Sequence, residues 1–171
     1  MDLFASPYNC QVPTFCSWIQ DESAFVTNAF SIHWGSPWVS FVNAPWSLLL
    51  KILQKVASDQ AEVRCITPYW TQQPWWPLLL SLATDHPRLI PEFPDLLQVP
   101  QDQDSQGRPA RLPPSTRLIA WKLSGVPSMA TGFRRALWHT SQQRGAAATK
   151  IQNWRLYRYV PSRRSSRCQY Y

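Results

Sequence analysis

The chain has 171 residues, of which 44% are hydrophobic and ten are tryptophan, a composition that excludes a wholly disordered protein. Its charge is divided, because residues 1–107 hold all ten acids and four bases, whereas residues 108–171 hold thirteen bases and no acid. This asymmetry indicates a polyanionic partner, DNA or RNA, although a basic part that only keeps the chain solvated has the same composition.

The first predicted elements are short strands. Residues 2–6 have the composition of a strand end that runs into a loop, and residues 14–19 of a second short strand. Residues 21–30 are expected to form a turn and a short helix. Residues 38–43 are rich in β-branched and aromatic residues and stop before Pro45, which suits the first turn of a helix.

An amphipathic helix is the clearest predicted element. Between residues 46 and 58 the apolar residues recur on one face at helical spacing, and Lys51 and Lys55 fall on the opposite face. Residues 61–68 predict a buried strand that ends at a proline, and residues 73–85 predict a second helix. Because strands and helices alternate with short connections, we expect parallel strand pairing in a three-layer α/β domain.

The second half of the chain is proline-rich and then basic. Residues 101–107 predict an exposed loop, residues 116–125 one more strand, and residues 128–144 and 146–159 two basic helices. We therefore divide the chain into an α/β domain at residues 1–125, a basic helical segment at residues 126–160 and a disordered tail at residues 161–171.

Several classes of protein are not indicated. The four cysteines include no C-x-x-C pair and the three histidines are scattered, so no metal site is predicted. The apolar runs at residues 48–50 and 78–80 are too short to cross a bilayer, and no secretory leader opens the chain. We expect an intracellular protein, nuclear or cytoplasmic, with no membrane partner.

The stretch FVNAPW, which ends at Trp46, carries groups with distinctive chemistry. Ligands of open α/β sheets bind beyond the carboxyl ends of strands, and both Asp2 and Asn43 are predicted to stand at such ends. The Asn43 side chain and the main-chain carbonyl of Ala44 can accept the two hydrogens of an exocyclic amine. Pro45 stiffens the turn, and Trp46 can stack on a base taken out of a duplex. The same residues also suit a plain strand-to-helix turn, and both interpretations stay open.

Several motifs occur in the order that they have in one known family. They are DLFAS followed by Asn9, FCSW, NAFSIHW, FVNAPW, KILQKV, ITPYWTQQPWWPLL and LIAWKLSG. The sequence resembles the phage-type DNA adenine N6-methyltransferases, whose pattern includes Asp-x-Phe-Ala and Asn-Pro-Pro-aromatic. Over residues 2–125 it is similar to the methyltransferase-like region in polyproteins of DIRS-like tyrosine-recombinase retrotransposons. That region lies between reverse transcriptase with ribonuclease H and the recombinase.

The resemblance implies a truncated Rossmann-like fold of the methyltransferase type, with S-adenosylmethionine as the methyl donor. Asp2 would bind the ribose or amino-acid part of this donor and Phe4 would pack nearby, while Asn28 stands where the family has a donor-side acid. The target amine would be held by Asn43, Ala44, Pro45 and Trp46.

Three departures from the family pattern favour an inactive protein. Asn28 cannot supply a carboxylate to the donor, Ala44 replaces the first proline of the amine motif, and the strand leading into Asp2 is absent. The sequence therefore predicts a fragment of a retroelement polyprotein, an inactive relic of a DNA adenine N6-methyltransferase with no cofactor. The alternative is an active, S-adenosylmethionine-dependent enzyme.

The basic segment near the C-terminus offers a second candidate site. Lys150, Trp154, Arg155, Tyr157 and Arg158 combine cations with aromatic rings, a pattern suited to phosphate contact and base stacking. The same residues suit a small helical hairpin with an aromatic core. The resemblance places the start of the recombinase's DNA-binding region at this point of the chain.

Overall fold

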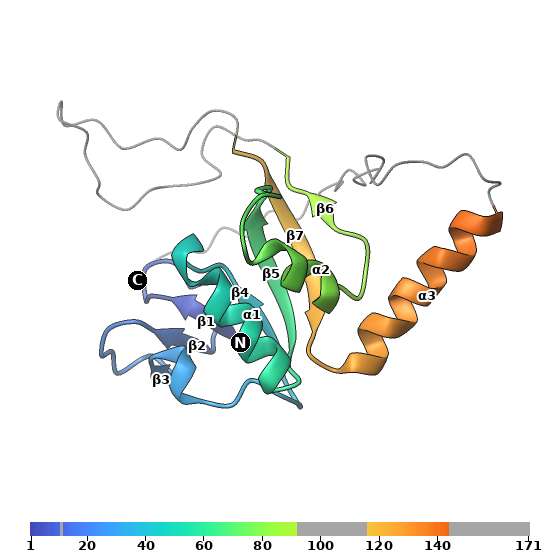
Figure 1. Cartoon of the computed structure of the whole chain (residues 1–171). Coiled ribbons are helices and arrows are strands. Elements are labelled where there is room, and N and C mark those ends of the chain that lie inside the picture. The colour runs from blue at the N-terminus through green and yellow to red at the C-terminus, as the bar shows by residue number, and fades with distance from the viewer. Residues whose placement is uncertain (11, 92–115, 144–171) are drawn as a thin grey trace, which may run out of the picture.

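A mixed β-sheet is the centre of the protein. The computed structural model describes residues 1–10, 12–91 and 116–143, with a seven-stranded sheet in the order β3-β2-β1-β4-β5-β7-β6 (Figure 1). The strands are β1 (Asp2–Ala5), β2 (Phe15–Ser17), β3 (Val26–Thr27), β4 (Val39–Val42), β5 (Glu62–Pro68), β6 (Arg88–Leu89) and β7 (Leu118–Ser124).

The sheet is parallel from β3 to β5 and antiparallel beyond. β1 pairs in parallel with β2 and β4, β2 with β3, and β4 with β5. β7 runs antiparallel to both of its neighbours, β5 and β6. The pairing of β5 with β7 extends from Glu62 opposite Ser124 to Pro68 opposite Leu118. The expected parallel pairs are confirmed, whereas the reversed direction of β7 was not predicted.

The longer helices follow the strands along the chain. They are α1 (Leu49–Ser58), α2 (Trp76–Leu82) and α3 (Pro127–Gln143), and two single-turn 3-10 helices are η1 (Ala29–Ser31) and η2 (Trp46–Leu48). The predicted amphipathic helix is confirmed as η2 and α1. Each aliphatic side chain that it buries stabilises the folded state by roughly 1.5–3 kcal/mol. Its fully buried residues are Leu49, Ile52, Leu53 and Val56.

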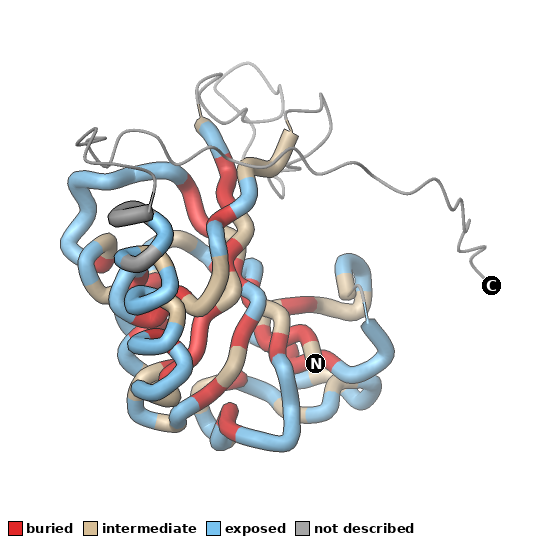
Figure 2. The backbone as a smooth tube through the Cα atoms, turned by 90° about the vertical axis from the view of Figure 1, so that its right-hand side faces the viewer, coloured by how far each residue is buried: buried red, intermediate tan, exposed pale blue. Residues whose placement is uncertain are grey.

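α1 and α2 lie on the same face of the sheet (Figures 1 and 2). Alternation along β5 separates the two faces, since Val63, Cys65 and Thr67 are buried towards the helices while Arg64 is exposed. Over β4, β5 and β7 the opposite face carries no helix within the described residues. The protein is an α/β protein as predicted, but the expected third layer is not found over these strands in the part that the structure describes.

Some sequence-based assignments need correction. Residues 21–30 contain β3 and η1 in place of the predicted turn and helix, and β6 was missed. Both strands have only two residues, too few to show an alternating pattern. The helix predicted at residues 128–144 is confirmed as α3, and Arg134 Nη1 attaches it to α2 by donating a hydrogen bond to Ser81 O at 2.6 Å. The loop at residues 101–107 and the helix at residues 146–159 lie outside the described residues.

Candidate functional site

The strand order reverses between β1 and β4. From β1 the chain continues outward through β2 and β3 and then crosses back to β4 and β5 on the other side. In open α/β sheets ligands bind where the order reverses, beyond the carboxyl ends of the two strands. Those ends are Ala5 and Val42. The loops that follow them therefore contain the residues able to form a site.

Asn43 directly follows β4 at this edge of the sheet, as predicted. Its side chain is exposed, and it forms no hydrogen bond within the described residues. The next residue, Ala44, is buried, and the Pro45 carbonyl oxygen accepts a hydrogen bond from Leu48 N at 2.9 Å to begin η2. The turn therefore fixes the main chain on both sides of Asn43 and leaves its amide group open to a ligand.

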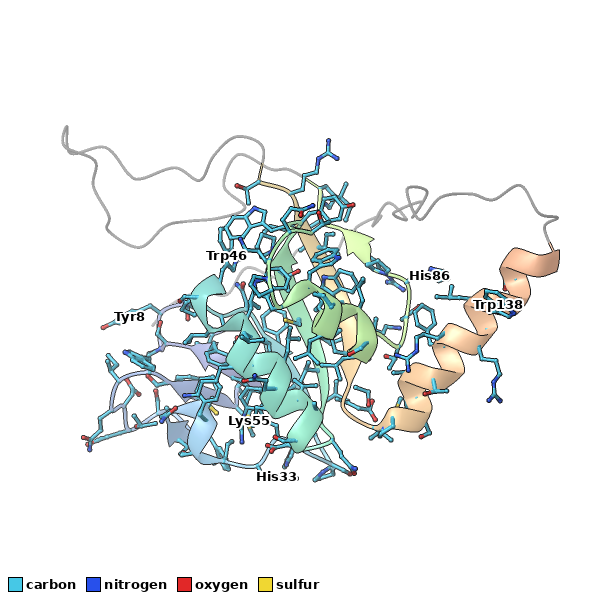
Figure 3. The ribbon with its side chains drawn as sticks, viewed as in Figure 1. Tyr8, His33, Trp46, Lys55, His86 and Trp138 are labelled. Atoms are coloured by element: carbon cyan, nitrogen blue, oxygen red, sulfur yellow. The ribbon has the colours of Figure 1, made fainter. Side chains whose placement is uncertain are left out.

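Aromatic rings gather at the same edge, and we call Trp46, Tyr69, Trp70 and Trp76 the aromatic rim. Trp46 meets Trp70 edge to face, with 4.9 Å between ring centroids and 82° between planes. Tyr69 packs in the same way on Trp76, the first residue of α2, at 5.5 Å. Tyr69 and Trp70 remain exposed, and Figure 3 places Trp46 at the upper edge of the sheet. The rim therefore presents planar apolar surface beside the turn of Asn43.

Sequence reasoning did not select Tyr69 or Trp70, although a signal was present. These residues directly follow a strand that was predicted to pair in parallel with the strand before Asn43. Residues after neighbouring parallel strands meet at one edge of the sheet. The predicted pairing was therefore sufficient to place both rings near Asn43.

Asp2 does not lie at this edge, contrary to the prediction. It opens β1 and is paired in register with Phe41, two residues before Asn43. Its side chain is buried, and Oδ1 accepts a hydrogen bond from Phe4 N at 3.2 Å. The sequence suggested that a strand ended there because residues 2–6 have the composition of a strand end that runs into a loop. Residues 2–5 themselves form β1, an inner strand of the sheet, so Asp2 contributes to the fold below the site.

The other two donor-side candidates, Phe4 and Asn28, are also engaged within the fold. Phe4 packs edge to face on Phe30 and Trp34, at 5.6 and 6.0 Å between centroids. Asn28 has a φ of 68°, which asparagine tolerates better than most residues, and its Oδ1 caps η1 by accepting from Phe30 N at 3.1 Å. Their side chains serve packing and capping in place of a ligand.

The loop after β1 does not fit a nucleotide-like cofactor. Asn9 Oδ1 accepts a hydrogen bond from Ser6 N at 2.6 Å, and Cys10 N donates to Ser6 O at 3.0 Å, which closes a tight turn. Residues 6–14 contain no glycine, and Tyr8 projects from the turn (Figure 3). Sheets that bind such cofactors use glycines here so that the main chain can approach the ligand closely. Within the described residues, the loop after β1 therefore does not offer S-adenosylmethionine this close main-chain approach.

Other kinds of site have little support. Among the described residues no three His, Cys, Asp or Glu side chains gather as metal ligands. In the same part of the chain, no helix has the length and apolar character needed to span a membrane. The candidates in the basic segment, Lys150, Trp154, Arg155, Tyr157 and Arg158, lie outside the described residues.

Comparison of the sequence with protein-family models found no match, and comparisons with curated proteins and with solved structures found none either.

Proposed function

We propose that this chain is a degenerate methyltransferase-like module of a retroelement polyprotein, which binds nucleic acid through an unpaired base and transfers no methyl group. The observation that carries the proposal is a contrast across the reversal point of the sheet. On the β4 side the Asn43 amide is open beside the aromatic rim. On the β1 side Asp2, Phe4 and Asn28 are occupied by contacts within the fold.

The strand order supports a Rossmann-like origin of the methyltransferase type. The parallel part follows the order 3-2-1-4-5 of dinucleotide-binding sheets. The antiparallel β7 then lies between β5 and β6, an arrangement typical of S-adenosylmethionine-dependent methyltransferases. The resemblance of residues 2–125 to the retroelement region supports the same origin.

The chemistry available on the β4 side suits an adenine base. Asn43 Oδ1 and the Ala44 carbonyl oxygen can accept the two amine hydrogens, and each such neutral hydrogen bond contributes about 0.5–1.5 kcal/mol. Stacking of a base on an aromatic ring such as Trp46 or Trp70 contributes about 1–3 kcal/mol. These contributions make the site a selective but weak one. The thirteen bases of residues 108–171 would add salt-dependent binding without sequence selectivity.

Fluorescence anisotropy with labelled single-stranded DNA tests the binding proposal. Two oligonucleotides differ only at one central base, adenine or N6,N6-dimethyladenine, which has no amine hydrogen to donate. The unmodified chain should prefer adenine by about tenfold, the effect of losing one to two hydrogen bonds. Asn43→Ala should abolish this preference, whereas Gln54→Ala, which removes an exposed amide from α1, should keep it. Equal affinity of the unmodified chain for both oligonucleotides would contradict the proposal.

Methyl transfer tests the proposed lack of activity. We expect no transfer of labelled methyl groups from S-adenosylmethionine to DNA and no binding heat in calorimetry, because the donor-side residues are engaged elsewhere. Transfer that is lost on Asn43→Ala would instead identify an active DNA adenine N6-methyltransferase. The proposed origin has a separate test, which is whether reverse transcriptase precedes this reading frame in the genome and a recombinase follows it.

A further inference from the structure

An open pocket lies on the face of the sheet opposite α1 and α2. It has a volume of about 210 Å³ and is formed by β4, β5, β7 and β6. Phe41, Ile66 and Ala120 contribute apolar surface, and Arg64, Arg88 and Lys122 contribute three cations.

The strand register arranges these residues in two rows. Phe41 is paired with Arg64, and Arg64 with Lys122, so one row crosses three strands. Ile66 is paired with Ala120, and Ala120 with Arg88, which gives a second row. Rows two residues apart are separated by about 7 Å along the strands, and neighbouring strands by about 4.8 Å. The aromatic ring and the cations therefore share one compact surface.

The charges of this surface favour an anionic ligand. Arg64 and Arg88 are exposed, and neither has an ion-pair partner among the described residues. Lys122 pairs with Asp85, and Glu62 lies on the same face two residues before Arg64. Asp85 also lies close enough to Arg88 for the two charges to attract, so Arg64 has the less compensated charge. Each of the two guanidinium groups can bind a phosphate through two parallel hydrogen bonds.

The position of Asn43 selects the kind of anion. Alternation continues past the end of β4, where Val42 and Ala44 are buried, Phe41 is half-buried and Asn43 is exposed. Asn43 is exposed and follows Phe41 by two residues, so it lies within about 7 Å of Phe41 along the chain, where the pocket face meets the edge of the sheet. We propose that this face binds single-stranded nucleic acid, with phosphates at Arg64 and Arg88, a base against Phe41 and the following base towards Asn43. An acidic peptide would use the cations but not the ring and the amide together.

The inference rests on the proposed function. An oligothymidylate of about twelve nucleotides is the probe that tests the inference separately from the proposed function. Thymine has no exocyclic amine for Asn43, so binding of this probe reports the phosphate and stacking contacts alone. In anisotropy titrations of the full chain, the double variant Arg64→Ala with Arg88→Ala should reduce the slope of log affinity against log salt concentration by about 1.4. It should also lower the affinity at 0.1 M salt by about 25-fold. Phe41→Leu should weaken binding by about fivefold or more.

The control removes one charge from another surface. Lys51→Ala changes an exposed cation on α1, outside the pocket and outside the basic residues 108–171, and should weaken binding by less than about twofold, against about fivefold for Arg64→Ala alone. Equal losses in these two single variants would overturn the inference, because the bound strand would then not favour the pocket over other exposed cations. Competition by polyglutamate as strong as by DNA at equal charge would also overturn it, in favour of an acidic peptide. If the oligothymidylate titrations contradict the inference but the preference for adenine still depends on Asn43, the proposed function is retained.

Discussion

Replacing Gly125 with alanine should destabilise the protein strongly, because other main-chain segments pass this glycine closely. An added Cβ would lie 1.9 Å from the Val56 carbonyl oxygen, 2.8 Å from the Val56 carbonyl carbon and 2.9 Å from Gln60 Cα. All three are main-chain atoms, so no side-chain rotation can relieve the contact. Gly125 N also donates a hydrogen bond to Ala61 O at 2.8 Å, which holds the end of β7 against the turn between α1 and β5.

The size of the effect follows from these distances. Non-bonded heavy atoms pack at about 3.5 Å, so the end of β7 would have to move away from α1 by roughly 1.5 Å. Such a shift weakens the Gly125–Ala61 hydrogen bond and opens space beside the fully buried Val56. We expect a loss of about 3–5 kcal/mol in the free energy of unfolding. That is a large part of the roughly 5–15 kcal/mol that holds a typical domain together.

Gly132→Ala is the matched control, because a Cβ at this position in α3 would meet no atom within 4 Å. Alanine is the better helix former by about 1 kcal/mol, so this variant should be neutral or more stable. Urea unfolding followed by tryptophan fluorescence measures both variants, and the midpoints are comparable if the slope is unchanged. A loss below about 1 kcal/mol for Gly125→Ala, or equal losses for both variants, would refute the placement of β7 against α1 and β5.

Two further predictions concern titration and thiol reactivity. Burial alone would raise the pKa of Asp59, but hydrogen bonds from Lys55 and Trp34 N outweigh this effect and lower the pKa. The pKa of Asp85 is lowered chiefly by a hydrogen bond from Lys122. Because both pKa values lie below the model-peptide value of 3.8, this stabilisation is present above that pH and is lost as the pH falls below it. Melting temperatures should therefore drop from about pH 5 to pH 2, less steeply in Asp59→Asn, and identical pH profiles would contradict the assignment. Burial raises the pKa of Cys65 to about 12, and burial with the nearby Asp2 charge raises that of Cys16 to about 11. Maleimide at neutral pH should label Cys10 well before these two thiols, as mapped by mass spectrometry, and equal labelling rates would show that the two are accessible.

The sequence by itself determined the local elements with a long, regular pattern. The apolar residues of α1 recur every three to four positions, and those of β4 and β5 are β-branched or aromatic and stop at prolines, so each segment has one favoured structure. It also placed Asn43 after a strand end, because Pro45 marks the change from strand to helix.

Only the tertiary structure decided how these elements combine. The direction of β7 depends on its long-range pairing with β5 and not on its own seven residues, which would read the same in a parallel strand. The pairing of β5 with both β4 and β7 sets the row of Phe41, Arg64 and Lys122, three residues far apart in the sequence. The shared sheet edge brings Trp70 to Trp46. Asp2 and Asn28 were predicted to contact the methyl donor, but contacts within the folded chain engage both side chains instead. The sequence shows which chemical group each side chain has. Strand register and packing decide whether other residues contact that group or leave it exposed to a ligand.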